Sequence, residues 1–353
     1  MIKQEQSDPS SAPMAVVIVT YNSADVIEDC LDSLRASEGA DLRVIVVDNK
    51  SPDNSIETVV TWASRNGLVI NDVECGSAQT PKGELPWLTL LRSPLNKGFA
   101  GGVNEGLRWA LPHKEIDLFW ILNPDCMVEP QTARAYVDCA SRSGEFSLMG
   151  GRVVYPQPIG LIQSDGGRIK NWGACYSVNQ GLPEADATPP DPASLDFISG
   201  ANMVASRRFI ETAGMMREDY FLYYEEVDWA ARRGALPLAW CKGGRVAHHV
   251  GTSIGSGSHG RMASPLSEYF NNRNRMWFVW RHRRGLSPLA FSSSLVRGLK
   301  MLLKGEKKAA MGAILGTCLL PPSRDVADKV APKAARLAFG RYGRAPEETS
   351  TGR

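Results

Sequence analysis

Asp125 is a residue whose type and position could support metal chemistry. It follows an apolar run and a proline turn in the stretch FWILNPDCMVEP, residues 119–130. A carboxylate at the end of a buried strand can hold a divalent cation, and the cation can neutralise a diphosphate. One carboxylate binds a metal weakly, so a second ligand is needed, and the stretch RVAHHVGTSIG offers His248 and His249. The alternative is a polar turn with one hydrogen-bonded histidine.

Candidate general bases occur in the stretch YFLYYEEVDWAARR, residues 220–233. Glu225, Glu226 and Asp228 stand close together at an expected helix start. Acidic residues there interact favourably with the helix dipole, which would explain them without catalysis. Aromatic side chains precede them, however, and a carboxylate among aromatic rings loses hydration and becomes a stronger base. The residues alone leave the choice among the three carboxylates open.

Alternating strands and helices must position these groups. Residues 14–21 (MAVVIVTY) and 42–49 (LRVIVVDN) are short, valine-rich apolar runs, typical of strands buried on both faces. A segment with helical spacing follows each, so the order predicts a parallel sheet with right-handed crossovers. LTLLRSP and IDLFWILN continue the sheet, and NKGFAGGVNEG opens a helix between them. The polar residues 71–89 are interpreted as a variable excursion.

Polar residues follow three of these expected strands. They are residues 20–22 (Thr-Tyr-Asn), Asp48 with Asn49, and residues 123–125 (Asn-Pro-Asp). Each group alone is an ordinary turn former. Ligands of an open parallel sheet bind outside the carboxyl ends of its strands, so three such groups at one edge predict a binding site. The glycine-rich segment 96–106 is a candidate for close backbone approach to a nucleotide, or it permits tight helix packing. Neither GxGxxG after the first strand nor GxxxxGK[ST] occurs.

Composition limits the protein class. The chain has 353 residues, of which 43% are hydrophobic, enough for one large domain or two small ones. Its seven cysteines include no CxxC pair, so neither a zinc site nor a disulfide framework is indicated, and reduced thiols in a cytosolic protein are expected. The N-terminus lacks an apolar signal core, and no apolar run approaches the roughly 18 residues of a spanning helix.

Charge is distributed unevenly. From Asn271 onward there are 17 basic and 5 acidic residues, so this part should bind an anionic partner, either nucleic acid or a lipid surface. Residues 286–320 alternate apolar and basic groups, which suits an amphipathic helix lying on a membrane. The alternative is a helix packed on its own domain. The expected face of the helix carries Leu295, Leu299 and Leu302, with Arg297, Lys300 and Lys304 elsewhere.

Taken in order, these motifs resemble family 2 inverting glycosyltransferases, and most of all their bacterial rhamnosyltransferase-like branch. The resemblance rests on VVIVTYNSADVIEDCLDSL, VIVVDNKSPDNS, NKGFAGGVNEGL, ILNPD, SGANMVASRRFIETAGMMREDYFLYYEEVDWAARR and HHVGTSIG…YFNNRNRMWF, and covers roughly residues 14–280. It implies the GT-A fold, an α/β fold with a mostly parallel central sheet flanked by helices. It also implies a nucleotide-diphosphate sugar donor and Mg²⁺ or Mn²⁺. The predicted organisation is a disordered N-terminus (1–13), a GT-A domain (14–284), a basic amphipathic helical extension (285–343) and a disordered tail (344–353).

The resemblance also implies roles for individual residues. Asn123-Pro124-Asp125 stands where the family has its DXD-type motif, and Asn123 at the first position leaves Asp125 most of the coordination of the metal and diphosphate. His248 begins an HxxGxS motif and would complete the metal site. The second residue of the acidic pair, Glu226, would be the base, although this pair is Glu-Glu where the family commonly has Glu-Asp. The remaining implied contacts are Thr20, Asn22 and Asp48 with the donor's base and ribose, Lys97 and Gly98 beside the nucleotide, and Tyr269, Arg273 and Asn274 near the acceptor and diphosphate.

The predicted function is inverting transfer of a sugar to a hydroxyl of a saccharide acceptor, as part of cell-surface polysaccharide synthesis. L-rhamnose from a dTDP donor is the first expectation, with a lipid-linked acceptor at the inner face of the cell membrane. UDP-sugar-dependent glucosyl, galactosyl or N-acetylglucosaminyl transfer is the alternative, and a non-catalytic sugar-nucleotide-binding protein is a second one. A nucleotidyltransferase would need a glycine-rich phosphate signature after the first strand. A nucleic-acid binder would leave the strand-end residues unexplained.

Overall fold

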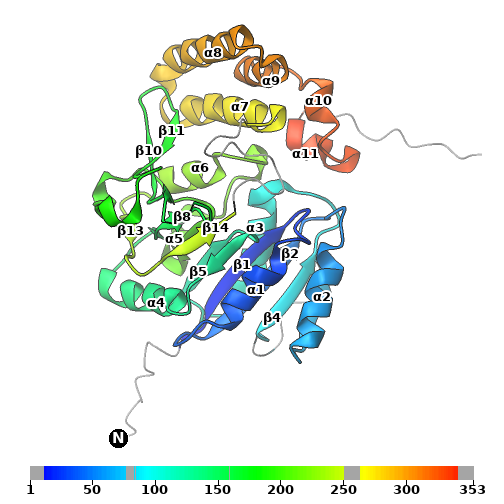
Figure 1. Cartoon of the computed structure of the whole chain (residues 1–353), viewed down its shortest axis with the longest axis vertical. Helices are drawn as coiled ribbons and strands as arrows, with labels where there is room; N and C mark the ends of the chain where they lie inside the picture. Colours follow the sequence, from blue (N-terminus) through cyan, green and yellow to red (C-terminus); the bar gives the residue numbers. More distant parts are fainter. Residues whose placement is uncertain (1–11, 77–82, 84, 159, 250–262, 341–353) are drawn as a thin grey trace, which may run out of the picture.

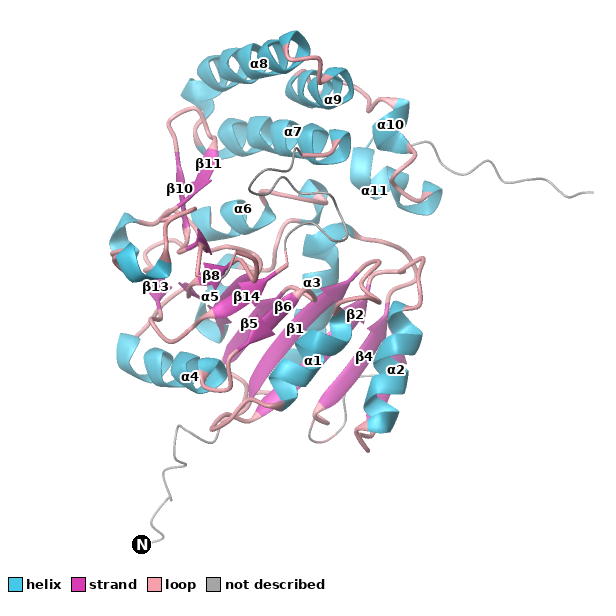
Figure 2. Ribbon diagram, viewed as in Figure 1, coloured by secondary structure: helices cyan, strands magenta, loops and turns pink. Residues whose placement is uncertain are grey.

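Eight strands form the central sheet of this computed structural model, which describes residues 12–76, 83, 85–158, 160–249 and 263–340. The sheet order is β13-β7-β12-β5-β1-β2-β4-β3 (Figures 1 and 2). The strands are β1 (Met14–Thr20), β2 (Leu42–Asp48), β3 (Ile70–Glu74), β4 (Leu88–Arg92), β5 (Leu118–Leu122), β7 (Leu148–Gly150), β12 (Asn202–Ser206) and β13 (Ala239–Trp240).

Most of this sheet is parallel, as predicted. β1 pairs in parallel with both β2 and β5, and β4 lies parallel between β2 and β3. Only β12 runs against its neighbours β5 and β7. The strand Ile70–Glu74 was not predicted, because the residues from 71 onward were interpreted as an excursion. It lies at the sheet edge and buries only Val73, so it has no apolar run in its sequence.

Helices cover both faces of the sheet, because alternate side chains of β1 point to opposite sides. Met14, Val16 and Ile18 belong to one hydrophobic core, and Ala15, Val17 and Val19 to the other. The first core packs against α1 (Ile27–Arg35), α2 (Ser55–Arg65) and α4 (Thr132–Ser143). The second packs against α3 (Gly98–Ala110), α5 (Arg207–Ala213) and α6 (Glu225–Ala231).

A second, smaller sheet lies beside the end of β5. Its order is β6-β14-β8-β9, formed by β6 (Cys126–Val128), β14 (Val246–His248), β8 (Val153–Val154) and β9 (Ile162–Ser164). β14 is antiparallel to β6, and His248 pairs with Cys126. This pairing carries a residue from late in the chain to the turn that follows β5. A separate hairpin is formed by β10 (Gly167–Ile169) and β11 (Cys175–Ser177).

The C-terminal part is helical. It consists of α7 (Pro265–His282), α8 (Ser287–Leu303), α9 (Lys307–Thr317), α10 (Arg324–Ala327) and α11 (Ala335–Phe339). Short 3₁₀ segments occur at Glu184–Asp186, Pro192–Ser194, Glu218–Tyr220, Arg284–Leu286 and Pro332–Ala334. Among the helices of the described ranges, none combines the length and apolarity needed to cross a membrane.

The amphipathic segment predicted over residues 286–320 forms two helices with different surroundings. α9 packs closely on α7: a Cβ added to Gly316 would lie 2.3 Å from the Tyr269 carbonyl oxygen, and one added to Gly312 would lie 2.4 Å from that of Pro265. α8 lies outside α9, farthest from the central sheet (Figure 1). α9 is therefore packed on its own protein, whereas α8 forms the outer layer. The predicted disordered ends fall largely outside the described residues.

Candidate active site

A cavity of about 800 Å³ lies at the carboxyl ends of the central strands. Residues that follow β1, β2 and β5 line it, and the start of α6 and the end of β14 close it from other sides. Parts of α9 and α10 also contribute to its wall. The site residues among its lining are Gly98, Asn123, Asp125, Glu225, Glu226 and His248.

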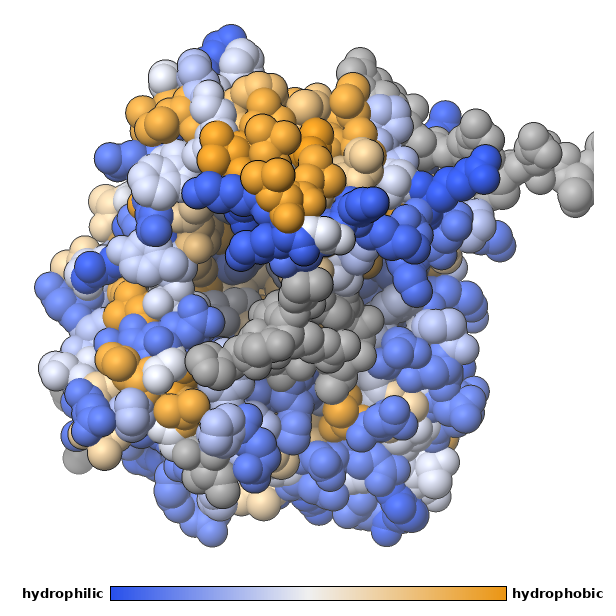
Figure 3. Space-filling model, turned by 45° about the horizontal axis from the view of Figure 1, so that its top comes forward, coloured by the Kyte–Doolittle hydropathy of each residue, from blue (hydrophilic) through white to orange (hydrophobic). Residues whose placement is uncertain are grey.

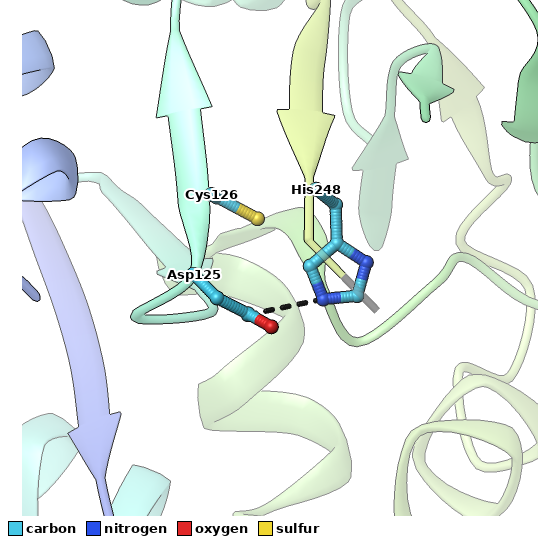
Figure 4. Close-up of side chains that lie close together, drawn as sticks. All are labelled: Asp125, Cys126 and His248. Atoms are coloured by element: carbon cyan, nitrogen blue, oxygen red, sulfur yellow. Dashed lines mark ion pairs between the residues drawn. The ribbon is translucent and has the colours of Figure 1, made fainter. Parts of the chain in front are cut away.

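Asp125 and His248 both line this cavity, and their side chains point toward each other (Figure 4). Both side chains are buried, and His248 Nε2 lies 3.1 Å from Asp125 Oδ1. The Asn123 amide lies 3.1 Å from the same ring nitrogen, and His248 Nδ1 lies 2.9 Å from Gln163 Oε1. Because the Gln163 oxygen can only accept, Nδ1 carries a proton, and in the neutral ring Nε2 presents its lone pair toward Asp125.

This donor set fits a divalent cation. The contact between Asp125 Oδ1 and His248 Nε2, 3.1 Å long, is an ion pair when the imidazole is protonated, and it is a pair of adjacent cation ligands when the imidazole is neutral. Adjacent ligands of an octahedral cation with bonds of about 2.1 Å lie about 3 Å apart, which matches the spacing of Asp125 Oδ1 and His248 Nε2. Gln163 supplies the outer hydrogen bond that usually orients a ligating histidine.

Cys126 brings a third potential ligand to the same place, and no sequence pattern indicated it. Its sulfur, the Asp125 carboxylate and a His248 nitrogen all lie within 4.8 Å of one another. The thiol donates to the Ala201 carbonyl at 3.4 Å, and burial together with the Asp125 charge raises the pKa of Cys126 well above its usual range. A protonated thiol is a poor ligand for a hard cation, so we assign coordination to Asp125 and His248.

Glu225 and Glu226 face the cavity from the first turn of α6. Burial raises the pKa of Glu226 to about 7, and burial with the negative charge of Glu226 raises the pKa of Glu225 well above its usual range. Glu225 is buried, and its Oε2 has no hydrogen-bond partner within the described residues. Both carboxylates therefore have the desolvated surroundings that the aromatic sequence context predicted.

Asp228 lies outside the cavity, unlike the two glutamates. Its carboxylate is fully buried and does not line the cavity. It accepts hydrogen bonds from Tyr220 at 3.1 Å, His282 at 2.8 Å and Arg232 at 2.8 Å. Although burial opposes ionisation, the bonds from His282 and Arg232 lower the pKa of Asp228. The sequence placed Asp228 with the two glutamates because it lies nearby in the chain, but helical rotation turns it away from them.

The loop before Glu225 is conformationally strained. Phe221, Tyr223 and Tyr224 have φ angles of 64°, 68° and 72°, which cost of order 1–3 kcal/mol each for residues other than glycine. α7 holds the loop in this shape. The Asn274 amide donates to the carbonyl oxygens of residues 220, 222 and 223 at 2.7–2.9 Å.

Tyr269, Arg273 and Asn274, predicted near the acceptor and diphosphate, lie behind the cavity wall. All three are buried, and none lines the cavity. Arg273 Nη2 donates to the Tyr220 carbonyl at 2.8 Å, and the Tyr269 hydroxyl donates to the Leu320 carbonyl at 2.9 Å. Their hydrogen bonds are used inside the protein, so we reassign them as positioning residues for the acidic loop and the C-terminal helices.

Replacing Asn274 with alanine should lower kcat about 100-fold while the KM for the donor changes little. The substitution removes the bonds that hold residues 220–223, and a shift of about 1 Å in a catalytic group costs roughly that factor. Steady-state kinetics will test this. Asn272→Ala is the matched control, because Asn272 is equally buried in α7 but bonds to Glu268 within that helix. Equal kcat values for the two variants would contradict the positioning role.

The predicted donor residues are divided between the cavity wall and the layer behind it. Thr20 and Asp48 are buried behind the lining, where Thr20 Oγ1 lies 3.3 Å from Asp48 Oδ1. Asn49, the neighbour of Asp48, lines the cavity instead and donates to the Gly98 carbonyl at 2.8 Å. Asn22 is exposed beside β1 and is not part of the lining.

The glycine-rich segment connects the donor side to the acidic loop. Gly98 lines the cavity with φ of 73°, and a Cβ there would lie 2.1 Å from the Phe221 carbonyl oxygen. The Phe99 amide donates to that oxygen at 2.9 Å. Lys97 pairs with Glu105 and does not line the cavity. The glycine is therefore required for close approach of α3 to the loop that carries the candidate base.

Several lining residues were not predicted. Ser23 directly follows the strand-end group 20–22, and Asn96 begins the glycine-rich segment 96–106, so their neighbourhood was a usable signal. Gln163, Lys308 and Lys329 had none, because distant strands and helices bring them to the cavity. The part of the HHVGTSIG motif from residue 250 onward lies outside the described residues.

Comparison with known proteins gives consistent matches. Residues 15–212 match the family described as Glycosyl transferase family 2. The low-salt glycan biosynthesis hexosyltransferase Agl10 of Haloferax volcanii is 23% identical over 74% of this chain and 74% of its own length. The N-acetylglucosaminyl-diphospho-decaprenol L-rhamnosyltransferase of Mycobacterium tuberculosis is 24% identical over 82% of this chain and 97% of its own. The solved mannosyltransferase PcManGT of Pyrobaculum calidifontis, in complex with GDP-Man and Mn²⁺, covers 88% of both chains with a TM-score of 0.50 and 16% identity.

Proposed function

This chain belongs to glycosyl transferase family 2 and has the GT-A fold, and from this premise we propose that it transfers a sugar with inversion from a nucleotide-diphosphate donor to an acceptor hydroxyl. One observation carries the proposal. The Asp125–His248 pair and Glu226, which are remote in sequence, line the same cavity. One end of the cavity suits a cation with a diphosphate, and the other suits proton abstraction.

Glu226 acts as the general base. Its carboxylate takes the proton from the acceptor hydroxyl while that oxygen bonds to the anomeric carbon from the face opposite the diphosphate. The bond from the anomeric carbon to the diphosphate oxygen breaks in the same displacement, so the configuration inverts and the nucleoside diphosphate leaves. Asp125 and His248 would hold Mg²⁺ or Mn²⁺, which supplies positive charge for the departing diphosphate.

A dTDP-L-rhamnose donor is the first choice. The mycobacterial relative, named as an L-rhamnosyltransferase, supports it over nearly the full length of that protein. UDP-linked glucose, galactose or N-acetylglucosamine is the alternative, and the archaeal relative is named as a hexosyltransferase. A binding protein without catalysis would have no use for a half-buried carboxylate with a raised pKa such as Glu226.

The donor proposal is tested with a panel of nucleotide sugars and Mn²⁺. Thermal shift reports binding, and released nucleoside diphosphate reports turnover. We expect dTDP-L-rhamnose to give the largest Mn²⁺-dependent shift and the fastest nucleotide release with a saccharide acceptor. Turnover with a UDP-sugar but not with dTDP-L-rhamnose would favour the alternative donor. Binding without any nucleotide release across an acceptor panel would favour the non-catalytic protein.

A lipid-linked saccharide at the inner face of the cell membrane is the proposed acceptor. The name of the mycobacterial relative describes transfer onto a diphospho-decaprenol-linked sugar. In this chain Lys308 and Lys329 line the cavity wall formed by α9 and the residues after α10. Lys308 pairs with Asp325 at 2.9 Å, whereas Lys329 has no acidic partner within the described part of the chain. These cations support binding of an acceptor phosphate, and the proposed role is cell-surface polysaccharide synthesis.

The rate should depend on pH through Glu226. Only the ionised carboxylate accepts a proton, and burial raises its pKa to about 7. We therefore expect kcat/KM to rise about tenfold per pH unit below about 7 and to level off above it. Measurement of nucleotide release between acidic and mildly alkaline pH, at fixed Mn²⁺, will check this. A profile that levels off near the ordinary glutamate pKa would contradict the assignment.

A further inference from the structure

α8 buries small residues and exposes large apolar ones, which is the reverse of an ordinary surface helix. Its inward face carries Ala290, Ser294 and Gly298, which are spaced four residues apart and are buried. A Cβ added to Gly298 would lie 2.7 Å from the Ile314 side chain of α9. A surface helix normally buries its large apolar residues and exposes its small polar ones. Here the small residues make the packing contacts, Gly298 with α9 and Ala290 with the core that includes Val279 of α7.

Four large apolar residues of α8 point outward. Leu289, Val296, Leu299 and Leu303 are 47%, 50%, 54% and 88% exposed. At 3.6 residues per turn these four positions form one stripe along the helix. We call this stripe the α8 outer face. The stripe predicted from the sequence consisted of Leu295, Leu299 and Leu302. It differs from the α8 outer face, because Leu295 and Leu302 are partly buried. Figure 3 shows apolar surface gathered over the C-terminal helices and bordered by hydrophilic residues.

Basic side chains border the α8 outer face. Lys300 and Lys304 are exposed on one flank of the stripe, and Lys307 follows at the start of α9. None of these lysines pairs with an acidic residue in the described parts of the chain. Between residues 287 and 317 the sequence has five basic residues and one acidic residue. An apolar stripe with a basic flank is the pattern of a helix that lies in a membrane interface.

We propose that the α8 outer face docks on an anionic lipid bilayer, with its leucines among the acyl chains and its lysines at the headgroups. A second copy of this chain fits less well. A two-fold interface centred on α8 would gather Lys300 and Lys304 of both copies along the border of one apolar patch, and like charges would repel. A bilayer accepts the leucines and attracts the lysines at the same time.

Docking in this orientation would bring the cavity close to the headgroups. α8 packs on α9, and Lys308 of α9 lines the cavity, so one helix thickness, about 10 Å, separates the docked face from the cavity wall. A saccharide linked through a diphosphate to a membrane lipid would then reach Glu226 while its lipid stays in the bilayer. This last step rests on the proposed function, whereas the docking itself does not.

Vesicle flotation of the full-length chain tests the proposal. The apolar variant is Val296→Gln with Leu299→Gln and Leu303→Gln, and the charge variant is Lys300→Gln with Lys304→Gln. These residues are exposed, so the substitutions should leave the fold intact. A deletion of the residues from 286 onward would not isolate the α8 outer face, because it would also remove α9 from the cavity wall. Val69→Gln with Leu182→Gln is the matched control, since both residues are exposed on the glycosyltransferase domain.

We expect the wild type and the control to bind phosphatidylcholine vesicles that contain phosphatidylglycerol. The apolar variant should bind them at least about tenfold more weakly. The charge variant should lose about fivefold per lysine on anionic vesicles and nothing on pure phosphatidylcholine. Wild-type-like binding by the apolar variant, or no vesicle binding by the wild type, would overturn the proposal. So would a wild-type dimer in sedimentation that the apolar variant abolishes while its vesicle binding stays unchanged.

Transfer to a short, water-soluble saccharide acceptor separates this proposal from the proposed function. The apolar variant should match the wild type in that assay, because its substitutions lie outside the cavity. If neither protein transfers sugar but the wild type alone binds anionic vesicles, the proposed function fails and the docking surface stands.

Discussion

Replacing Glu226 with glutamine should lower kcat by about 100- to 10,000-fold while donor binding stays nearly unchanged. The amide has almost the same shape as the carboxyl group but cannot accept the proton of the attacking hydroxyl. The Asp125–His248 pair, which should hold the diphosphate, is not altered. Single-turnover nucleotide release measures the chemical step, and calorimetry with the nucleoside diphosphate and Mn²⁺ measures binding. The residual activity should also lose its inflection near pH 7.

Glu225→Gln is the matched comparison for this prediction. Glu225 is adjacent in sequence, lines the same cavity and is more deeply buried than Glu226. If Glu226 is the base, Glu225→Gln should retain far more activity than Glu226→Gln. The reverse order, with normal kcat in Glu226→Gln and a large loss in Glu225→Gln, would move the catalytic role to Glu225.

Replacing Asp125 with alanine should weaken Mn²⁺ binding at least about 100-fold in the presence of nucleoside diphosphate. Loss of groups that only orient a metal ligand already costs 10- to 100-fold in affinity, and Asp125 is one of two assigned ligands. With His248 alone, the cavity would have no anionic protein ligand beside the imidazole. Titration followed by electron paramagnetic resonance measures free Mn²⁺ directly, and nucleotide release should fall in parallel.

Cys126→Ala controls for the neighbouring sulfur. The Cys126 sulfur lies in the same cluster, but it is protonated and bonded to the Ala201 carbonyl. We therefore expect this variant to bind Mn²⁺ as tightly as the wild type, with some loss of stability from the removed sulfur. A large loss of Mn²⁺ affinity in Cys126→Ala, together with normal affinity in Asp125→Ala, would assign the cation to the thiol instead.

The sequence predicted which residues lie at the carboxyl edge of the sheet, because the direction of the strands alone determines that edge. Valine-rich runs separated by helices indicate parallel strands, and parallel strands bring their carboxyl ends together. Asp125 and Gly98 could therefore be placed at one site from local patterns. Cys126 could not, because its position near His248 depends on the pairing of β14 with β6. Nothing in the sequence near either residue specifies that pairing.

The roles of residues on α7 were beyond sequence reasoning for a different reason. α7 buries polar residues such as Glu268, Asn272 and Asn274 alongside its aromatic ones. Its apolar pattern is therefore weak and does not reveal which side faces the protein. The motif at Arg273 and Asn274 was correctly recognised as notable. Its action on the 220–223 carbonyl groups, rather than on substrate, became visible only from the hydrogen bonds.

The buried face of α8 was not predicted. The pattern indicated an amphipathic helix with an apolar face of Leu295, Leu299 and Leu302, but of these only Leu299 is exposed, whereas Leu295 and Leu302 are partly buried. It did not indicate that Ala290, Ser294 and Gly298 would be buried, because small residues pack by close approach and not by apolar area. Close approach depends on the partner helix, which the periodicity of one segment does not contain.

The central claim is that Asp125 and His248 hold a cation and diphosphate in the same cavity as Glu226. Anomalous diffraction from crystals grown with Mn²⁺ and dTDP tests it most directly. We predict a manganese peak roughly 2.0–2.2 Å from Asp125 Oδ1 and His248 Nε2, with the β-phosphate between the ion and the Glu226 side of the cavity. A manganese peak bound elsewhere, with nucleotide in the cavity but no metal at Asp125 and His248, would contradict the account.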